Sequence, residues 1–303
     1  MVEKITCFFF FSILKTENTG EKQRKHFAER YIYMSSGPVL NLIFVGDIVG
    51  KGGRNAVKAL IPELKKRHNA SFVIANGENC ANGAGFSLSC IQDMESVVDV
   101  FTGGDHTWDQ KNFEQEIRSL KNMVRPANFS TMQPGKGWSV FRNPASGEVA
   151  VISLVGKVFM KDSAYCPFET VEKILKEIPP SVKCIIVDIH AEATSEKAAM
   201  AWFLDGKVTA VLGTHTHVQT ADARILPGGT AFLSDVGMTG GQDSILGRDI
   251  CDVVKKFRTG MPTRLNVTEK NIRLDYAVVS YELMTGHAVS VRAYSEFYHP
   301  ENM

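Results

Sequence analysis

The sequence contains no CxxC motif and no paired cysteine spacing. Its six cysteines are scattered along the chain, at Cys7, Cys80, Cys90, Cys166, Cys184 and Cys251. This pattern indicates neither a zinc knuckle nor a disulfide framework. We therefore expect a protein of a reducing compartment and predict a cytoplasmic location.

The chain also lacks an apolar run long enough to cross a bilayer, which takes roughly twenty residues. The stretch ITCFFFFSIL covers only residues 5–14. It resembles a signal-peptide core, but the flank MVEK carries an acid and a base, and no small-residue cleavage site follows cleanly. We prefer a translation start at Met34. Residues 1–38 are then an extension that is disordered or not translated, and residues 39–303 form a single domain.

An excess of charge of one sign is absent too. The 34 Lys and Arg residues nearly balance the 33 Asp and Glu residues, for a net charge of +1. Without a large basic surface we expect no duplex nucleic acid partner, and we expect no membrane partner. The composition, 44% hydrophobic and 22% charged, is that of an ordinary soluble globular protein.

From Leu40 onward, strand-like and helix-like segments alternate. Apolar runs that predict strands cover residues 40–45, 71–76, 98–103, 149–155, 183–188, 208–212 and 230–234. Amphipathic or bounded segments that predict helices cover residues 52–68, 88–97, 168–178 and 195–204. Two runs joined by MTGH in residues 271–294 predict a β-hairpin with Gly286 in its turn. The alternation predicts an α/β fold in which helices pack on sheets.

Residues of metal-ligand type follow five of the strand-like runs. They are Asp47, Glu78 with Asn79, Asp105 with His106, His190, and the pair His215 and His217. An isolated HxH pair is more often two surface histidines, but five such strand ends are typical of a fold that gathers loops over one sheet edge. A Gly-rich stretch, residues 235–244 (DVGMTGGQDS), is expected to be a loop that either binds an anion or is merely mobile.

The mixture of carboxylate, amide and imidazole groups suits iron, manganese or zinc better than calcium or a structural zinc. Seven ligands are too many for one tetrahedral ion. Two ions sharing a carboxylate would account for them, with a bridging hydroxide as the nucleophile in phosphoester hydrolysis.

Seven motifs in one order give the sequence a clear resemblance to a known family. They are GDIVGKGGR, NGEN, GDHTWD, RPANF, IHAEATSEK, GTHTHVQTADARILPGG and SDVGMTGG, between Asn41 and about Tyr294. They resemble the YmdB-like bacterial metallophosphoesterases of the calcineurin-like superfamily. The resemblance implies a four-layer sandwich of two mixed β-sheets flanked by helices, and a di-metal centre that usually holds iron. It also implies phosphodiesterase or phosphatase activity, with 2′,3′-cyclic nucleotides and cyclic AMP among the substrates.

The resemblance implies a role for each candidate residue. Asp47 matches a terminal ligand of the first ion and Glu78 the bridging carboxylate. The first ion also takes His217, with Asn79 beside it, and the second takes Asp105, His190 and His215. His106 matches a general acid near the leaving oxygen, although a residue that only orients a ligand would occupy the same place.

One motif departs from the family. GNH is usual where this chain has Gly104, Asp105 and His106, and a carboxylate at that position adds a negative charge to the site.

Two alternatives to a cyclic-nucleotide phosphodiesterase stay open: a phosphomonoesterase or 5′-nucleotidase on the same centre, and a catalytically weak regulatory RNA-interaction protein. The substrate is a nucleotide or a short RNA-derived phosphoester, and homo-oligomer formation also stays open.

Overall fold

The computed structural model describes residues 37–160 and 164–299. The predictions made for the N-terminal extension therefore lie almost wholly outside the described residues. Within the described ranges, no helix combines the length and the apolar character that crossing a membrane requires.

The first sheet is mixed and has its strands in the order β2-β12-β13-β1-β3-β4-β5, with β14 also paired to β13. The bounds are β1 Val39–Val45, β2 Asp47–Ile48, β3 Ala70–Asn76, β4 Val100–Thr102, β5 Met123–Val124, β12 Met238–Gly241, β13 Ile272–Glu282 and β14 Ala288–Phe297. β1, β3 and β4 run parallel, whereas β13 pairs antiparallel with β1. Residues 42–45 of β1 are all buried, as expected for a strand covered on both faces.

The second sheet has the order β10-β11-β9-β8-β7-β6 and is also mixed. Its strands are β6 Trp138–Asn143, β7 Gly147–Val155, β8 Cys184–His190, β9 Ala210–Thr214, β10 Arg224–Ile225 and β11 Ala231–Leu233. The central strands β7, β8 and β9 are parallel, so their carboxyl ends meet at one edge.

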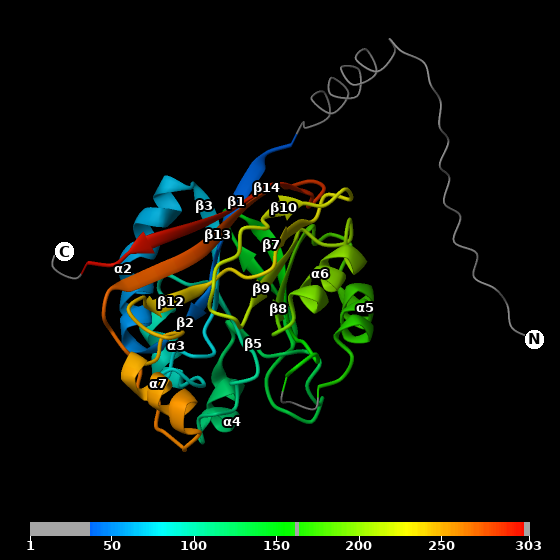
Figure 1. The fold of residues 1–303 in the computed structure, drawn as a ribbon. Coiled ribbons are helices and arrows are strands. Elements are labelled where there is room, and N and C mark those ends of the chain that lie inside the picture. Colours follow the sequence, from blue (N-terminus) through cyan, green and yellow to red (C-terminus); the bar gives the residue numbers. More distant parts are fainter. Residues whose placement is uncertain (1–36, 161–163, 300–303) are drawn as a thin grey trace, which may run out of the picture. The chain divides into compact units, whose positions relative to one another are not determined.

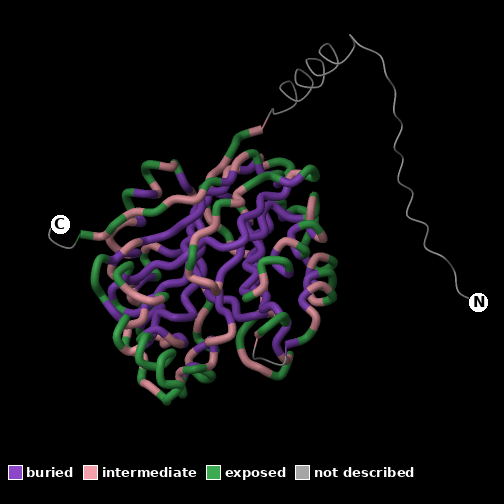
Figure 2. The backbone as a smooth tube through the Cα atoms, viewed as in Figure 1, coloured by how far each residue is buried: buried purple, intermediate pink, exposed green. Residues whose placement is uncertain are grey.

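Helices cover the outer face of each sheet, which gives four layers (Figure 1). The described helices are α2 Gly50–Arg67, α3 Leu88–Met94, α4 Phe113–Glu116, the 3₁₀ helix η1 Ile117–Ser119, α5 Pro167–Glu177, α6 Thr194–Phe203 and α7 Ile250–Thr259. α2 and α3 pack on the first sheet, and α5 and α6 pack on the second. A third apolar core, which includes Phe44 and Ile186, lies between the sheets. Figure 2, in the same view, shows the buried residues concentrated in the interior and the exposed residues on the outside.

This architecture confirms the predicted α/β sandwich of two mixed sheets flanked by helices. The hairpin is confirmed as well, with Gly286 at a φ of 77° between β13 and β14. The loop predicted over residues 235–244 is wrong in part, because Met238–Gly241 is strand β12, paired with β2 and β13. Its glycines are needed for packing: a Cβ on Gly241 would lie 2.6 Å from the carbonyl oxygen of Thr268.

Candidate metal centre

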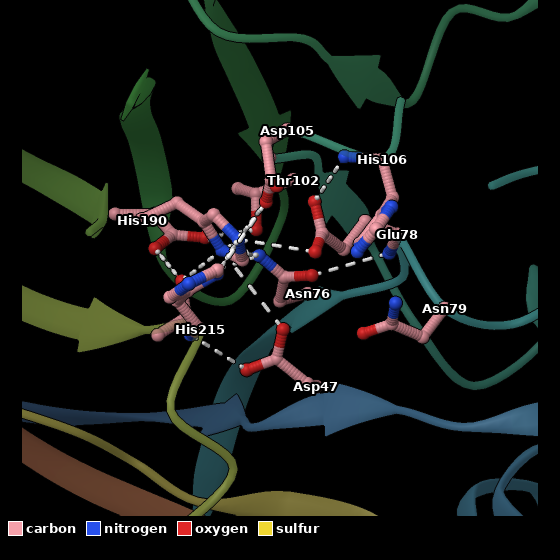
Figure 3. A network of polar contacts seen from close by, with 12 residues as sticks. Asp47, Asn76, Glu78, Asn79, Thr102, Asp105, His106, His190 and His215 are labelled. Atoms are coloured by element: carbon pink, nitrogen blue, oxygen red, sulfur yellow. Dashed lines mark hydrogen bonds and ion pairs between the residues drawn. The ribbon is translucent and has the colours of Figure 1, made fainter. Parts of the chain in front are cut away.

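The predicted site residues lie where connections leave the carboxyl ends of strands from both sheets. Figure 3 labels all of them except His217. Asp47 opens β2 directly after β1, Glu78 and Asn79 follow β3, and Asp105 and His106 follow β4. From the second sheet, His190 ends β8, and His215 and His217 follow β9. Parallel strands bring these connections to one edge, as predicted.

Four of the residues form a tight group. The candidate ligand atoms of Glu78, Asp105, His190 and His215 all lie within 4.8 Å of one another. His190 Nε2 is 3.0 Å from Glu78 Oε1, from Asp105 Oδ1 and from His215 Nδ1. One ring nitrogen carries at most one hydrogen, so it cannot satisfy three such neighbours. A cation among these atoms would satisfy all four, and the donor set therefore fits a transition metal ion.

The remaining three candidates form a second group. His217 Nε2 lies 3.1 Å from Asn79 Oδ1 and 3.9 Å from Asp47 Oδ1. Asp47 Oδ1 is buried and has no hydrogen-bond partner among the described residues. A buried carboxylate oxygen without a partner is costly, and a bound cation would remove that cost.

The electrostatics of the site favour a cation. Burial raises the pKa of Asp47 well above its ordinary value, and the nearby carboxylates of Glu78 and Asp235 raise it further. Burial also lowers the pKa of His217 to about 4, so this imidazole is neutral near pH 7, as a metal ligand must be. The buried carboxylate is thus unstable as an anion unless positive charge is supplied.

A buried hydrogen-bond network behind the centre fixes His190. Its Nδ1 lies 2.9 Å from Thr214 Oγ1, and the Thr214 hydroxyl donates to Asp188 Oδ1 at 2.7 Å. Asp188 is fully buried and also accepts hydrogen bonds from Thr102 and Asn76. Such a partner on one ring nitrogen turns the other nitrogen toward the metal position. Nothing in the residue pattern indicated this role for Asp188.

The backbone that carries His215 and His217 is unusual. Their φ values are 103° and 63°, which non-glycine residues rarely adopt. Thr216, between them, donates from its N–H and its hydroxyl to Asp235 Oδ2 at 3.0 and 2.7 Å. Asp235 is in turn paired with Lys197 Nζ at 2.8 Å. This buried ion pair therefore anchors the strained segment that presents both histidines.

Lys197→Met is expected to lower the free energy of unfolding by about 3–5 kcal/mol, because it leaves the buried Asp235 carboxylate without its cation. Denaturant unfolding measures the change, with the exposed Lys173→Met as the matched control. The control should stay within about 0.5 kcal/mol of wild type. Equal stability of Lys197→Met and wild type would show that the pair does not hold this segment.

His106 lies beside the two groups without joining either. Its backbone N–H donates to Glu78 Oε2 at 3.2 Å, and its Nδ1 lies 2.7 Å from Asp109 Oδ2. Burial lowers the pKa of His106, but the carboxylates of Glu78, Asp105 and Asp109 outweigh burial and raise it above its ordinary value. A raised pKa favours the protonated form of this side chain, which a proton donor needs. Asp109 stands in the same GDHTWD motif, yet its role was not predicted.

A cavity of about 320 Å³ opens onto both groups. Its lining includes Glu78, Asn79, His106, His215, His217 and Arg248. The Arg248 guanidinium is held by the backbone carbonyls of Asn82, Gly83 and Leu265. The cavity can thus admit an anionic group next to the candidate ligands.

The fold and the site define a phosphoric ester hydrolase of the metallophosphoesterase class, and comparisons with known proteins support this assignment. A crystal structure of a phosphatase from Mycoplasma pneumoniae has a TM-score of 0.80 and 32% identity, covering 88% of this chain and 96% of that one. A crystal structure of a hypothetical protein from Thermus thermophilus also has a TM-score of 0.80, with 34% identity, covering 86% of this chain and 100% of that one.

The family follows from the sequence match. The profile of YmdB-like proteins matches residues 43–294, and the chain belongs to this family. It is also 43% identical over 254 residues to the 2′,3′-cyclic-nucleotide 2′-phosphodiesterase of Bacillus subtilis strain 168, a match that covers 83% of this chain and 95% of the relative. The predicted family is thereby confirmed.

Proposed function

We propose that this protein hydrolyses phosphodiester bonds of cyclic nucleotides with two bound metal ions. The observation that carries the proposal is the pair of ligand groups around Glu78. Glu78 contacts His190 in the first group, and its charge also acts on Asp47 and His217 in the second. The substrate class is supported by the activity named for the Bacillus subtilis relative.

Each ion has its own set of residues in this proposal. Asp47, Asn79 and His217 would hold one, Asp105, His190 and His215 the other, and Glu78 would lie between them. Iron is the expected metal, and manganese or zinc would suit the same donors. When bound, the ions would neutralise phosphoryl oxygens and lower the pKa of a water molecule.

The proton for the leaving oxygen is assigned to His106. Because Asp109 accepts the hydrogen on Nδ1, Nε2 is the nitrogen that is left to face substrate. The charged imidazole donates its Nε2 hydrogen to the oxygen that leaves phosphorus and becomes neutral, which is general acid catalysis.

A screen of the purified protein tests the proposal. Bis-p-nitrophenyl phosphate, p-nitrophenyl phosphate, and 2′,3′- and 3′,5′-cyclic nucleotides are compared with iron, manganese or zinc. The proposal predicts a preference for diesters. A preference for monoesters would favour a phosphatase, the activity named for the Mycoplasma pneumoniae protein. No turnover with any metal would favour a regulatory protein.

Asp105→Asn is expected to weaken metal retention while turnover at saturating metal stays level or rises. The substitution restores the usual family residue and removes one negative charge beside His190 and His215, so a phosphate diester is repelled less. Activity is followed as metal is titrated in. Asp109→Asn is the matched control, since it makes the same change of charge at a side chain that contacts His106. This control should lower turnover without weakening metal retention. Loss of activity in Asp105→Asn with both metals bound would give this carboxylate a chemical role.

A further inference from the structure

A second cavity, of about 370 Å³, borders the metal centre. Its lining includes Trp108, Asp109, Phe129, Ser130, Gln133 and Tyr165. Asp105 lines it too, and the same side chain lies 3.0 Å from His190 Nε2. A ligand held by the metal ligands would therefore extend into this cavity without leaving the site.

The chemistry of the lining suits a neutral planar group. Three of the described lining residues, Trp108, Phe129 and Tyr165, are aromatic, and none is basic. The carboxylates of Asp105 and Asp109 would repel a phosphate placed here. Aromatic side chains bind nucleobases by stacking, whichever base is present.

The loop that forms one wall is built around a buried arginine. Arg125 is 5% exposed. Its guanidinium donates to the carbonyl oxygens of Pro126, Ser130, Gln133 and Pro134, at 2.7, 3.4, 3.1 and 3.0 Å. These hydrogen bonds from Arg125 fix the conformation of the loop before a ligand binds.

Tyr165 is anchored by its backbone while its ring stays accessible. The Tyr165 N–H donates to the Asn128 carbonyl at 2.8 Å, and Asn128 Nδ2 donates to the Tyr165 carbonyl at 3.0 Å. Tyr165 is nevertheless 62% exposed. A large exposed aromatic residue on a fixed backbone is a stacking surface with little ordering cost.

The cavity also offers hydrogen-bond donors. Gln133 Oε1 accepts the Trp108 indole N–H at 2.9 Å, which leaves the Gln133 amide nitrogen as a donor. Ser130 Oγ accepts from the Met132 N–H, so its hydroxyl hydrogen is available as well. Every base carries carbonyl or ring-nitrogen acceptors that such donors can meet.

We propose that this cavity binds the nucleobase of the substrate, stacked on Tyr165, while the phosphate lies at the metal centre. The inference rests on the proposed function and adds which part of the substrate is recognised. The phosphate is then recognised at the ligand groups, and the base is recognised by the loop of residues 125–134 and by Tyr165.

Calorimetry on the metal-loaded protein tests the subsite without relying on turnover. The probes are the 3′-monophosphates of adenosine, guanosine, cytidine and uridine, and methyl riboside 3-phosphate, which lacks a base. Wild type should bind at least one nucleotide about tenfold more tightly than the base-free probe. Tyr165→Ala should abolish this preference, Tyr165→Phe should keep it, and Met132→Ala, an exposed neighbour outside the cavity lining, should not change it.

Gln133→Glu is an independent second variant, because its carboxylate still accepts from Trp108 but no longer donates. It should weaken nucleotide binding about fivefold or more relative to the base-free probe. Equal affinity of wild type for all five probes, or a preference that survives in Tyr165→Ala and Gln133→Glu, would overturn the subsite. Hydrolysis of cyclic nucleotides is assayed separately, so a failure of the proposed function is seen as lost turnover with the base preference intact.

Discussion

Alanine at Glu78 is expected to lower the turnover of bis-p-nitrophenyl phosphate by at least about 10³-fold and to release at least one metal ion. The carboxylate is 1% exposed, lies 3.0 Å from His190 Nε2, and acts electrostatically on Asp47 and His217. Its loss removes the only residue assigned to both ions. Elemental analysis of protein purified with its metal intact should find about two ions per chain in wild type and fewer in the variant.

Glu114→Ala, which removes an exposed carboxylate from α4, is the matched control and should keep both metal and activity. Glu78→Gln separates charge from shape, because an amide of the same size replaces the carboxylate. It should resemble Glu78→Ala in metal content. If wild type and Glu78→Ala each hold one tightly bound ion, the centre has a single metal.

His106→Ala should reduce turnover by roughly 10² to 10⁴ and leave metal content unchanged, as expected for removal of a general acid. The backbone N–H that donates to Glu78 is retained in this variant, so the Glu78 carboxylate keeps that contact. The loss should be smaller for a p-nitrophenyl ester, whose leaving group needs no proton, than for a cyclic nucleotide. Steady-state kinetics on both substrates, with elemental analysis, measures these effects.

Asp109→Asn serves as the companion variant. It removes the carboxylate that contacts His106 Nδ1 while His106 itself stays in place, so the loss of rate should be smaller than in His106→Ala. The loss should again be smaller for the p-nitrophenyl ester than for the cyclic nucleotide. A metal lost on His106→Ala would instead show that His106 orients a ligand. Equal losses on both substrates would show that it does not protonate the leaving oxygen.

The strands were predictable because most are continuous apolar runs buried on both faces, such as Leu42 to Val45 in β1. Strand β6 was not predicted, since Trp138–Asn143 is an edge strand whose side chains are only partly buried. β12 was mistaken for a loop because it is rich in glycine. At Gly241 the backbone of Thr268 lies too close for a side chain, so glycine is required there by close packing. Local composition does not distinguish that crowding from flexibility.

The candidate ligands could be predicted from the sequence because the carboxyl ends of parallel strands meet at one edge of a sheet. This rule of topology requires no knowledge of distances. It did not reveal Asp188, Lys197 or Asp235. Their importance depends on which side chains meet across the core: Asp188 faces Asn76 and Thr102 from the other sheet, and Lys197 of α6 reaches Asp235 beyond β11. Such pairings follow from three-dimensional packing and have no signature in the spacing of residues.

The place of β13 in the first sheet has a consequence for the synthesis of the chain. β13 pairs with both β12 and β1, although β1 is made first and β13 almost last. All seven candidate ligands leave the ribosome before β13 does, while the apolar strand β1 still has an unpaired edge that other chains can join. A nascent chain that ends after His217 thus carries every candidate ligand and still cannot complete the sheet that positions Asp47, Glu78 and Asp105.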